Sequence, residues 1–119
     1  MSELRLLAGR YAVCQLAADA EVPPAFFSVT RTADELSVVC AEEQAPEGAR
    51  CESGWRILQV AGPLEFSLTG VLAAIAAPLA EAGVSIFAVS TFDTDYVLLK
   101  ETDVATASAA LRDAGHRMG

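Results

Sequence analysis

The sequence is poor in basic residues. Its 119 residues include 8 Lys and Arg against 16 Asp and Glu, a formal net charge of −8, and Lys100 is the single lysine. Nucleic acids and anionic membrane surfaces attract proteins through clustered Lys and Arg. We therefore expect neither a nucleic acid nor a membrane as a partner.

Long apolar runs are also missing. The richest one, Val71 to Ala80, is interrupted by Pro78 and is far shorter than the roughly 20 residues of a membrane-spanning helix. The first residues show no basic stretch followed by an apolar one, so no signal peptide is expected. The three cysteines are an odd count without a C-x-x-C spacing, which favours reduced thiols and a cytoplasmic location.

Residues that usually carry catalysis are scarce. His116 is the only histidine and lies near the C-terminus, where chains are often disordered. Cys14 and Cys40 fall in expected strands as small buried hydrophobes, and no nucleophile-elbow or phosphate-loop motif occurs. Asp93-Thr94-Asp95 lacks the glycine and distal glutamate of a calcium loop. We expect no enzyme, no cofactor and no metal site.

Apolar residues make up 53% of the chain, enough for a globular fold with a real core. A hairpin-like segment occurs twice with a shift of 60 positions, which lays Ala25–Thr30 on Ser85–Ser90 and Glu35 on Asp95. Each copy is an apolar strand, a polar turn ending in an acid, and a second apolar strand, the pattern of a β-hairpin. The repeat predicts two copies of one supersecondary unit.

The second half of the chain predicts the order strand, helix, strand, strand, helix, most of a ferredoxin-like βαββαβ unit. Gly83 is the expected stop of the first helix, Pro78 should bend its last turn, and Thr102 or Asp103 should cap the second helix. Both middle strands carry apolar residues on both faces, which predicts central strands. The expected elements are Trp55–Val60, Thr69–Ala82, Val84–Ser90, Tyr96–Lys100 and a last helix ending at Ala114.

The first half predicts strands at Leu4–Leu7, Tyr11–Leu16, Phe26–Thr30 and Leu36–Cys40, with a short Pro23-Pro24 segment in place of a long helix and a polar connector over Ala41–Ser53. The fold class is therefore α+β, with two ferredoxin-like units, antiparallel sheets and helices on one face. We place the N-terminal unit at residues 1–61 and the C-terminal unit at residues 62–119.

Two features suggest a ligand site. The segment Leu68-Thr69-Gly70-Val71 opens a helix, whose unpaired N–H groups and positive dipole end bind carboxylates; Gly70 either admits a ligand to the backbone or packs tightly on a strand. Asp95 stands where a turn re-enters an apolar strand, and it either bonds amides of its own hairpin or holds a cationic group. Together they would suit a zwitterion such as a free amino acid.

These residues resemble the ACT domain, a ferredoxin-like module that binds amino acids and regulates metabolic enzymes. The helix start at Gly70 and the segment Leu79-Ala80-Glu81-Ala82-Gly83-Val84 match its general pattern. A closer resemblance, through Pro78-Leu79-Ala80, Ser90-Thr91-Phe92 and Asp95, is to bacterial tandem ACT proteins and to the CASTOR family of cytosolic arginine sensors. The first half resembles the N-terminal ACT-like unit of those bacterial proteins.

The resemblance implies a ligand held between two ACT units. Gly70 and Val71 match backbone that wraps the ligand, with Thr69 beside them; Thr91 and Phe92 match residues that contact it, and Asp95 matches an acid that recognises its cationic part. On the facing unit, Ser85 and Ile86 match residues that close the site. The sensors have four ACT units and this chain has two, so we expect a homodimer. Leu68 replaces an acid of the sensors, which weakens the case for arginine itself.

Three functions are considered. The first is a small-molecule-binding regulatory module that senses a free amino acid at an interface between ACT units and acts on a partner enzyme. The second is a protein–protein interaction module that keeps the ACT scaffold without a ligand. An enzyme is the third and weakest reading, because fold alone does not exclude one.

Overall fold

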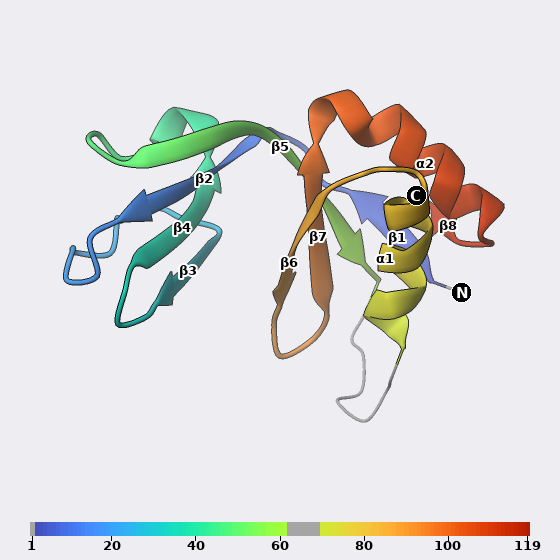
Figure 1. Cartoon of the computed structure of the whole chain (residues 1–119), viewed down its shortest axis with the longest axis horizontal. Coiled ribbons are helices and arrows are strands. Elements are labelled where there is room, and N and C mark those ends of the chain that lie inside the picture. The colour runs from blue at the N-terminus through green and yellow to red at the C-terminus, as the bar shows by residue number, and fades with distance from the viewer. Residues whose placement is uncertain (1, 62–69) are drawn as a thin grey trace. The chain divides into compact units, whose positions relative to one another are not determined.

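The computed structural model describes residues 2–61 and 70–119 (Figure 1). The fold is α+β, with a mixed sheet and two α-helices in the described residues. The chain forms two compact units, one made of Met1–Ala8 with Arg56–Gly119 and the other of Gly9–Trp55. The C-terminal unit thus takes its first strand from the N-terminus, and the predicted division between residues 61 and 62 stays a prediction.

The C-terminal unit has strands in the order β6–β7–β5–β1–β8. Their bounds are β1 Glu3–Leu6, β5 Arg50–Val60, β6 Ile86–Ser90, β7 Asp95–Lys100 and β8 Arg117–Met118. Two helices, α1 (Val71–Glu81) and α2 (Val104–Asp113), pack with Leu58, Val60, Val97 and Leu99 in one buried cluster. Because alternate strand residues point to the same face, both helices cover one face of this sheet, as predicted.

The left-handed Gly70 (φ 79°) precedes α1, and the left-handed Gly83 (φ 77°) follows its last turn, where the Val84 N–H bonds the Leu79 carbonyl. The expected stop at Gly83 is confirmed. Pro78 lies inside α1 and has no N–H for the carbonyl of Ala74, four residues earlier.

The His116 ring takes the place of the missing donor at the Ala74 carbonyl, with its Nε2 2.9 Å from that oxygen. Its other ring nitrogen, Nδ1, accepts a hydrogen bond from the Ser2 N–H at 3.1 Å. His116 is 5% exposed and directly precedes β8, which pairs with β1. The buried His116 side chain and the pairing of β8 with β1 therefore hold the last residues of the chain in place.

The N-terminal unit has strands β2 (Tyr11–Leu16), β3 (Ser28–Arg31), β4 (Leu36–Ala41) and the first part of β5, in the order β3–β4–β2–β5. All pairings in this order are antiparallel. Alternating residues of β2 and β4 form its core: Ala12, Cys14, Leu36, Val38 and Cys40. Its described residues include no α-helix, only a 3-10 turn at Glu42–Gln44.

Three strand predictions need correction. The β1–β8 pairing is parallel, so the sheets are not purely antiparallel. The expected connector contains the start of β5, which begins at Arg50 because its polar residues pair with β2. In the described residues β6 pairs with β7 on one side only, so it is an edge strand and not a central one.

The cysteine prediction also fails, because Cys14 and Cys51 form a disulfide and only Cys40 is free. The cause is the register of β2 against β5, which places Cys14 directly opposite Cys51. This pairing depends on a long-range contact that residue spacing does not reveal.

Both predicted hairpins are present, as β3–β4 and β6–β7. Their closing pairs are Arg31 with Leu36 and Ser90 with Asp95, an offset of one residue from the sequence repeat. Asp95 therefore occupies the strand position of Leu36, and not that of Glu35.

Candidate functional site

The predicted carboxylate-binding segment begins α1. Gly70 is its N-cap residue and is exposed, and Val71, the first helical residue, is half-buried against the core cluster. A Cβ added to Gly70 would meet no described residue within 4 Å, so tight packing on a described strand does not explain this glycine. Its left-handed backbone does explain it, since that conformation favours glycine. Thr69 and Leu68 lie outside the described residues.

The predicted cation-binding carboxylate closes the β6–β7 hairpin. Asp95 is half-buried, and its Oδ1 accepts a hydrogen bond of 2.6 Å from the Ser90 hydroxyl. The donor of this hydrogen bond is a side chain on the facing strand of the hairpin, and not a main-chain N–H group. Figure 1 shows the β6–β7 turn and the start of α1 at the same end of the C-terminal unit.

The turn before Asp95 is held by threonines. The Thr91 N–H donates to the Thr94 carbonyl at 2.9 Å, and the Thr91 hydroxyl lies 3.1 Å from the same oxygen. Thr94 is 4% exposed, and its hydroxyl donates to the Val60 carbonyl at 2.7 Å. Thr94 anchors the turn to the end of β5, a role that sequence reasoning missed and that no local pattern signals.

Phe92 projects from this turn with 79% of its surface exposed, the largest exposure of a big apolar side chain in the described residues. Aromatic residues are enriched in protein interfaces, although a single exposed apolar side chain is also common on protein surfaces. Phe92 thus gives the β6–β7 turn an exposed apolar side chain.

Ser85 and Ile86 do not join the others within one chain. Ile86 pairs with Leu99 and Ser90 pairs with Asp95, so Ile86 lies four residues along the strand from the closing pair. At a rise of ~3.3 Å per residue the separation is about 13 Å. Ser85 is exposed and Ile86 is half-buried at that far end of β6.

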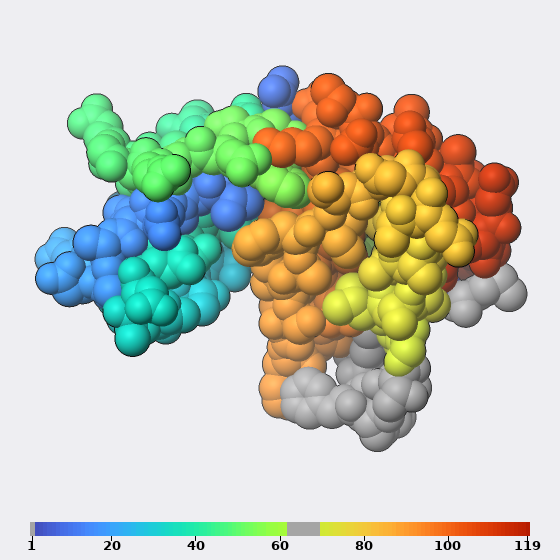
Figure 2. Space-filling model, in the orientation of Figure 1, coloured from blue at the N-terminus to red at the C-terminus, as the bar shows by residue number. Residues whose placement is uncertain are grey.

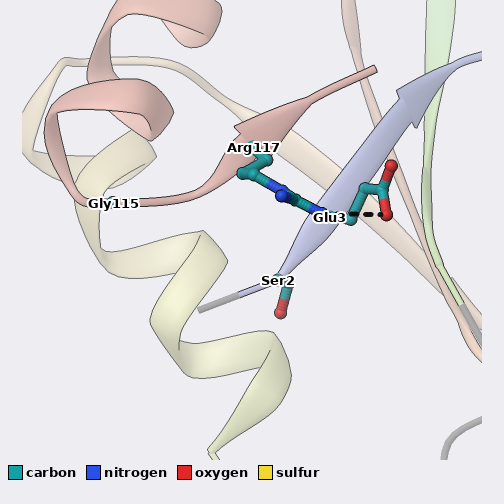
Figure 3. Close-up of a pocket in the computed structure, with 4 residues that line it drawn as sticks. All are labelled: Ser2, Glu3, Gly115 and Arg117. Carbon is teal, nitrogen blue, oxygen red and sulfur yellow. Dashed lines mark ion pairs between the residues drawn. The ribbon is translucent and has the colours of Figure 1, made fainter.

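A separate cavity of about 430 Å³ is lined by Ser2, Glu3, Gly115 and Arg117. Figure 3 shows the Arg117 side chain reaching from β8 toward Glu3 on β1, where Nη2 and Oε1 are 3.7 Å apart. Both side chains are mostly exposed, and ion pairs of this kind contribute little to stability. None of the predicted site residues that the structure describes lines this cavity.

Within residues 2–61 and 70–119, no group of three or more His, Cys, Asp or Glu side chains is arranged to hold a metal ion. No helix in this part of the chain is long and apolar enough to cross a membrane.

The space-filling view in Figure 2 shows the exposed surface of the β6–β7 hairpin and of α1.

Two family models match the sequence. The model described as the ACT domain matches residues 50–113, more than half of the chain. A second model, described as an N-terminal domain, matches residues 9–48.

Curated relatives include the cytosolic arginine sensor for mTORC1 subunit 1. The cattle protein is 31% identical over 91 residues, covering 67% of this chain and 28% of the relative. The human protein is 37% identical over 59 residues, covering 49% of this chain and 18% of the relative. The chain therefore spans under a third of the length of these relatives.

Among solved structures, a protein from Agobacterium tumefaciens is 36% identical with a TM-score of 0.92, covering 99% of this chain and 92% of that one. The regulatory subunit of aspartate kinase from Thermus thermophilus has a TM-score of 0.66 at 12% identity, covering 94% and 96%. At that identity the likeness concerns the fold alone.

Proposed function

This chain belongs to the ACT domain family and is related to the CASTOR sensors, and from this premise we propose that it is a non-catalytic regulatory module that binds a free amino acid. The relatives named as arginine sensors support a regulatory role. The same proposal includes a tandem arrangement of two ACT-like units, divided near residue 61, and a regulated partner enzyme. It also includes a cytoplasmic location, which the name of the cytosolic arginine-sensor relatives supports and the state of the cysteines no longer does.

The observation that carries the proposal is the Asp95 carboxylate. Asp95 belongs to the closing pair of the β6–β7 hairpin. In the β3–β4 hairpin the equivalent position is occupied by Leu36, whose side chain is 0% exposed. Placing a carboxylate at a position suited to a core side chain costs stability unless a partner compensates it. A ligand ammonium or guanidinium beside Asp95, in addition to the Ser90 hydroxyl, supplies that compensation.

The start of α1 supplies the complementary half of the site. Gly70 has no side chain to cap the helix, and helix N-termini present unpaired N–H groups that favour a carboxylate. An amino acid has both a carboxylate and an ammonium, so every free amino acid is a candidate. Arginine adds a second cation, but the sensors' acid before the helix glycine is Leu68 in this sequence.

The proposed site is completed by a second chain. Ile86 lies about 13 Å from the closing pair along β6, and Ser85 precedes it, so the two residues contact the same ligand only from a facing unit. The one-sided pairing of β6 leaves an edge whose Ile86, Phe87 and Val89 are only half-buried. A homodimer through this part of the unit would bring Ser85 and Ile86 of one protomer to the site of the other.

A thermal-shift panel of the twenty amino acids tests the proposal. A ligand at a hundred times its Kd adds about 2.7 kcal/mol to the free energy of unfolding, which for a domain of this size raises Tm by on the order of 10 °C. Asp95→Asn should abolish the shift. Asp93→Asn, which removes the same charge from the same turn, should leave it unchanged.

The alternative is an interaction module without a ligand, and the exposed Phe92 and the β6 edge favour it. It predicts a flat amino-acid panel together with a stable dimer or a captured enzyme. A ligand-induced shift that persists in Asp95→Asn would contradict the proposed site, even if the module still binds an amino acid elsewhere.

A further inference from the structure

The disulfide of the N-terminal unit joins two strands that are neighbours in the sheet. Cys14 on β2 lies directly opposite Cys51 on β5, with the two Cα atoms 4.1 Å apart. Opposed residues of antiparallel strands are separated by about 4.5–5.5 Å whatever their side chains, a distance that a disulfide can bridge. The strand register therefore keeps the two sulfurs adjacent when the bond is open as well as when it is closed.

The third cysteine is excluded from this pairing. The residue opposite Cys14 on β4 is Val38, and Cys40 lies two residues further along. Diagonal neighbours of this kind are about 7–8 Å apart, beyond the reach of an unstrained disulfide. Burial, and secondarily the negative charge of Glu43, raise the pKa of the Cys40 thiol, so it stays protonated and unreactive.

The two paired cysteines differ in their access to solvent. Cys14 is 2% exposed and belongs to the core cluster of its unit, whereas Cys51 is exposed at the start of β5. Thiol–disulfide exchange requires an attacking thiolate to reach a sulfur atom, so reaction with a dissolved thiol or disulfide begins at Cys51.

We propose that Cys14 and Cys51 form a reversible thiol–disulfide exchange site that responds to low-molecular-weight thiols and disulfides, with Cys51 as the entry sulfur. In oxidation, the Cys51 thiolate attacks a small disulfide RSSR, forming a mixed disulfide and releasing one RS⁻. The Cys14 thiol then loses its proton and attacks the Cys51 sulfur, releasing the second RS⁻. Two protein thiols and RSSR thus give the protein disulfide and two RSH, and reduction by two RSH is the reverse.

The state of this site sets the stability of the N-terminal unit. The bond joins residues 37 positions apart in the sequence and ties the polar start of β5 to β2. A cross-link of that span lowers the unfolding equilibrium constant on the order of a hundred- to a thousand-fold in the chain-entropy account. Reduction releases that constraint without breaking the strand pairing.

The test equilibrates the full chain in mixtures of reduced and oxidised glutathione, followed by acid quenching, alkylation and intact-mass analysis. The expected result is a single step between one and three alkylated thiols, with Cys40 as the remaining thiol, and the same two-thiol step in Cys40→Ala. An unchanged thiol count from the most reducing to the most oxidising mixture would overturn the proposal, as would a bond that involves Cys40.

Single variants test the order of reaction. Cys14→Ser should take up one glutathione on Cys51 under native conditions, whereas Cys51→Ser should take up none on the buried Cys14. Equal or faster uptake in Cys51→Ser would overturn the assignment of the entry sulfur. Should a variant fail to fold, the wild-type chain suffices: its Tm must fall on reduction, and an identical Tm in both states contradicts the proposed effect on stability.

Discussion

Asp95 and Leu36 occupy the same position in two hairpins of one chain, next to turns that are alike. In both turns a threonine N–H donates to the carbonyl three residues on, Thr32 to Glu35 and Thr91 to Thr94. The sequence repeat aligned Asp95 with Glu35, one position off, and a one-residue slip moves every strand side chain to the other face. The sequence therefore identifies Asp95 as a candidate site residue, but it does not reveal that Asp95 occupies the strand position of Leu36.

His116 and Pro78 act on one carbonyl group. Because Pro78 cannot bond the Ala74 oxygen, the His116 ring takes that place and also accepts the Ser2 N–H. His116→Ala leaves two partly buried backbone groups without these bonds, which we expect to cost about 2–4 kcal/mol of unfolding free energy. Urea denaturation measures the loss.

Pro78→Ala provides the matched second arm of a double-mutant cycle. An alanine N–H at residue 78 can bond the Ala74 carbonyl directly, so the cost of His116→Ala should be smaller in the Pro78→Ala background, by about 1 kcal/mol or more. Strictly additive losses would show that the two residues do not share this carbonyl.

Among the elements, α1 offers a paired test at its two ends. Gly70 and Gly83 have φ values of 79° and 77°, and a Cβ at either would meet nothing within 4 Å among residues 2–61 and 70–119. An alanine at each should therefore cost about 1–2 kcal/mol through backbone strain alone. Only Gly70→Ala should also weaken amino-acid binding, because only the N-terminal end of the helix faces the proposed ligand.

Titration calorimetry on both alanine variants separates the two effects. Comparable losses of stability with weakened binding in Gly70→Ala alone are the expected result. Equal binding by the two variants would remove the start of α1 from the site.

Elements with strong periodicity were predicted well, and elements held by distant contacts were not. The spacing of Leu72, Ile75 and Leu79 indicates α1, and alternation indicates β2 and β4. β8 has two residues and no pattern of its own; it exists because it pairs with β1. The polar start of β5 is a strand for the same reason, since β2 supplies its hydrogen-bond partners.

At the scale of the whole molecule, the proposed ligand site requires two copies of the chain. Ser85 and Ile86 lie at the opposite end of β6 from Asp95, so one chain alone leaves the proposed site incomplete. We expect a dimer at micromolar concentration, measured by sedimentation equilibrium over a dilution series. A monomer at every concentration would contradict a ligand site shared between protomers.

The sequence indicated the chemistry of the candidate site better than its assembly. Gly70 and Asp95 were singled out because a helix start and a strand-entry acid have recognisable local patterns. Thr94 was missed, because its bond to the Val60 carbonyl joins residues far apart in the chain. The disulfide between Cys14 and Cys51 depends on strand register in the same way.

The most direct test of amino-acid binding is an amide chemical-shift map of the full chain, recorded by heteronuclear NMR while each amino acid is added. If the chain binds an amino acid at the proposed site, we expect saturable shifts that centre on Val71 and on the turn from Thr91 to Asp95, and that disappear in Asp95→Asn. Shifts centred instead on the cavity beside Ser2 and Arg117, or no shifts with any of the twenty amino acids, would contradict it.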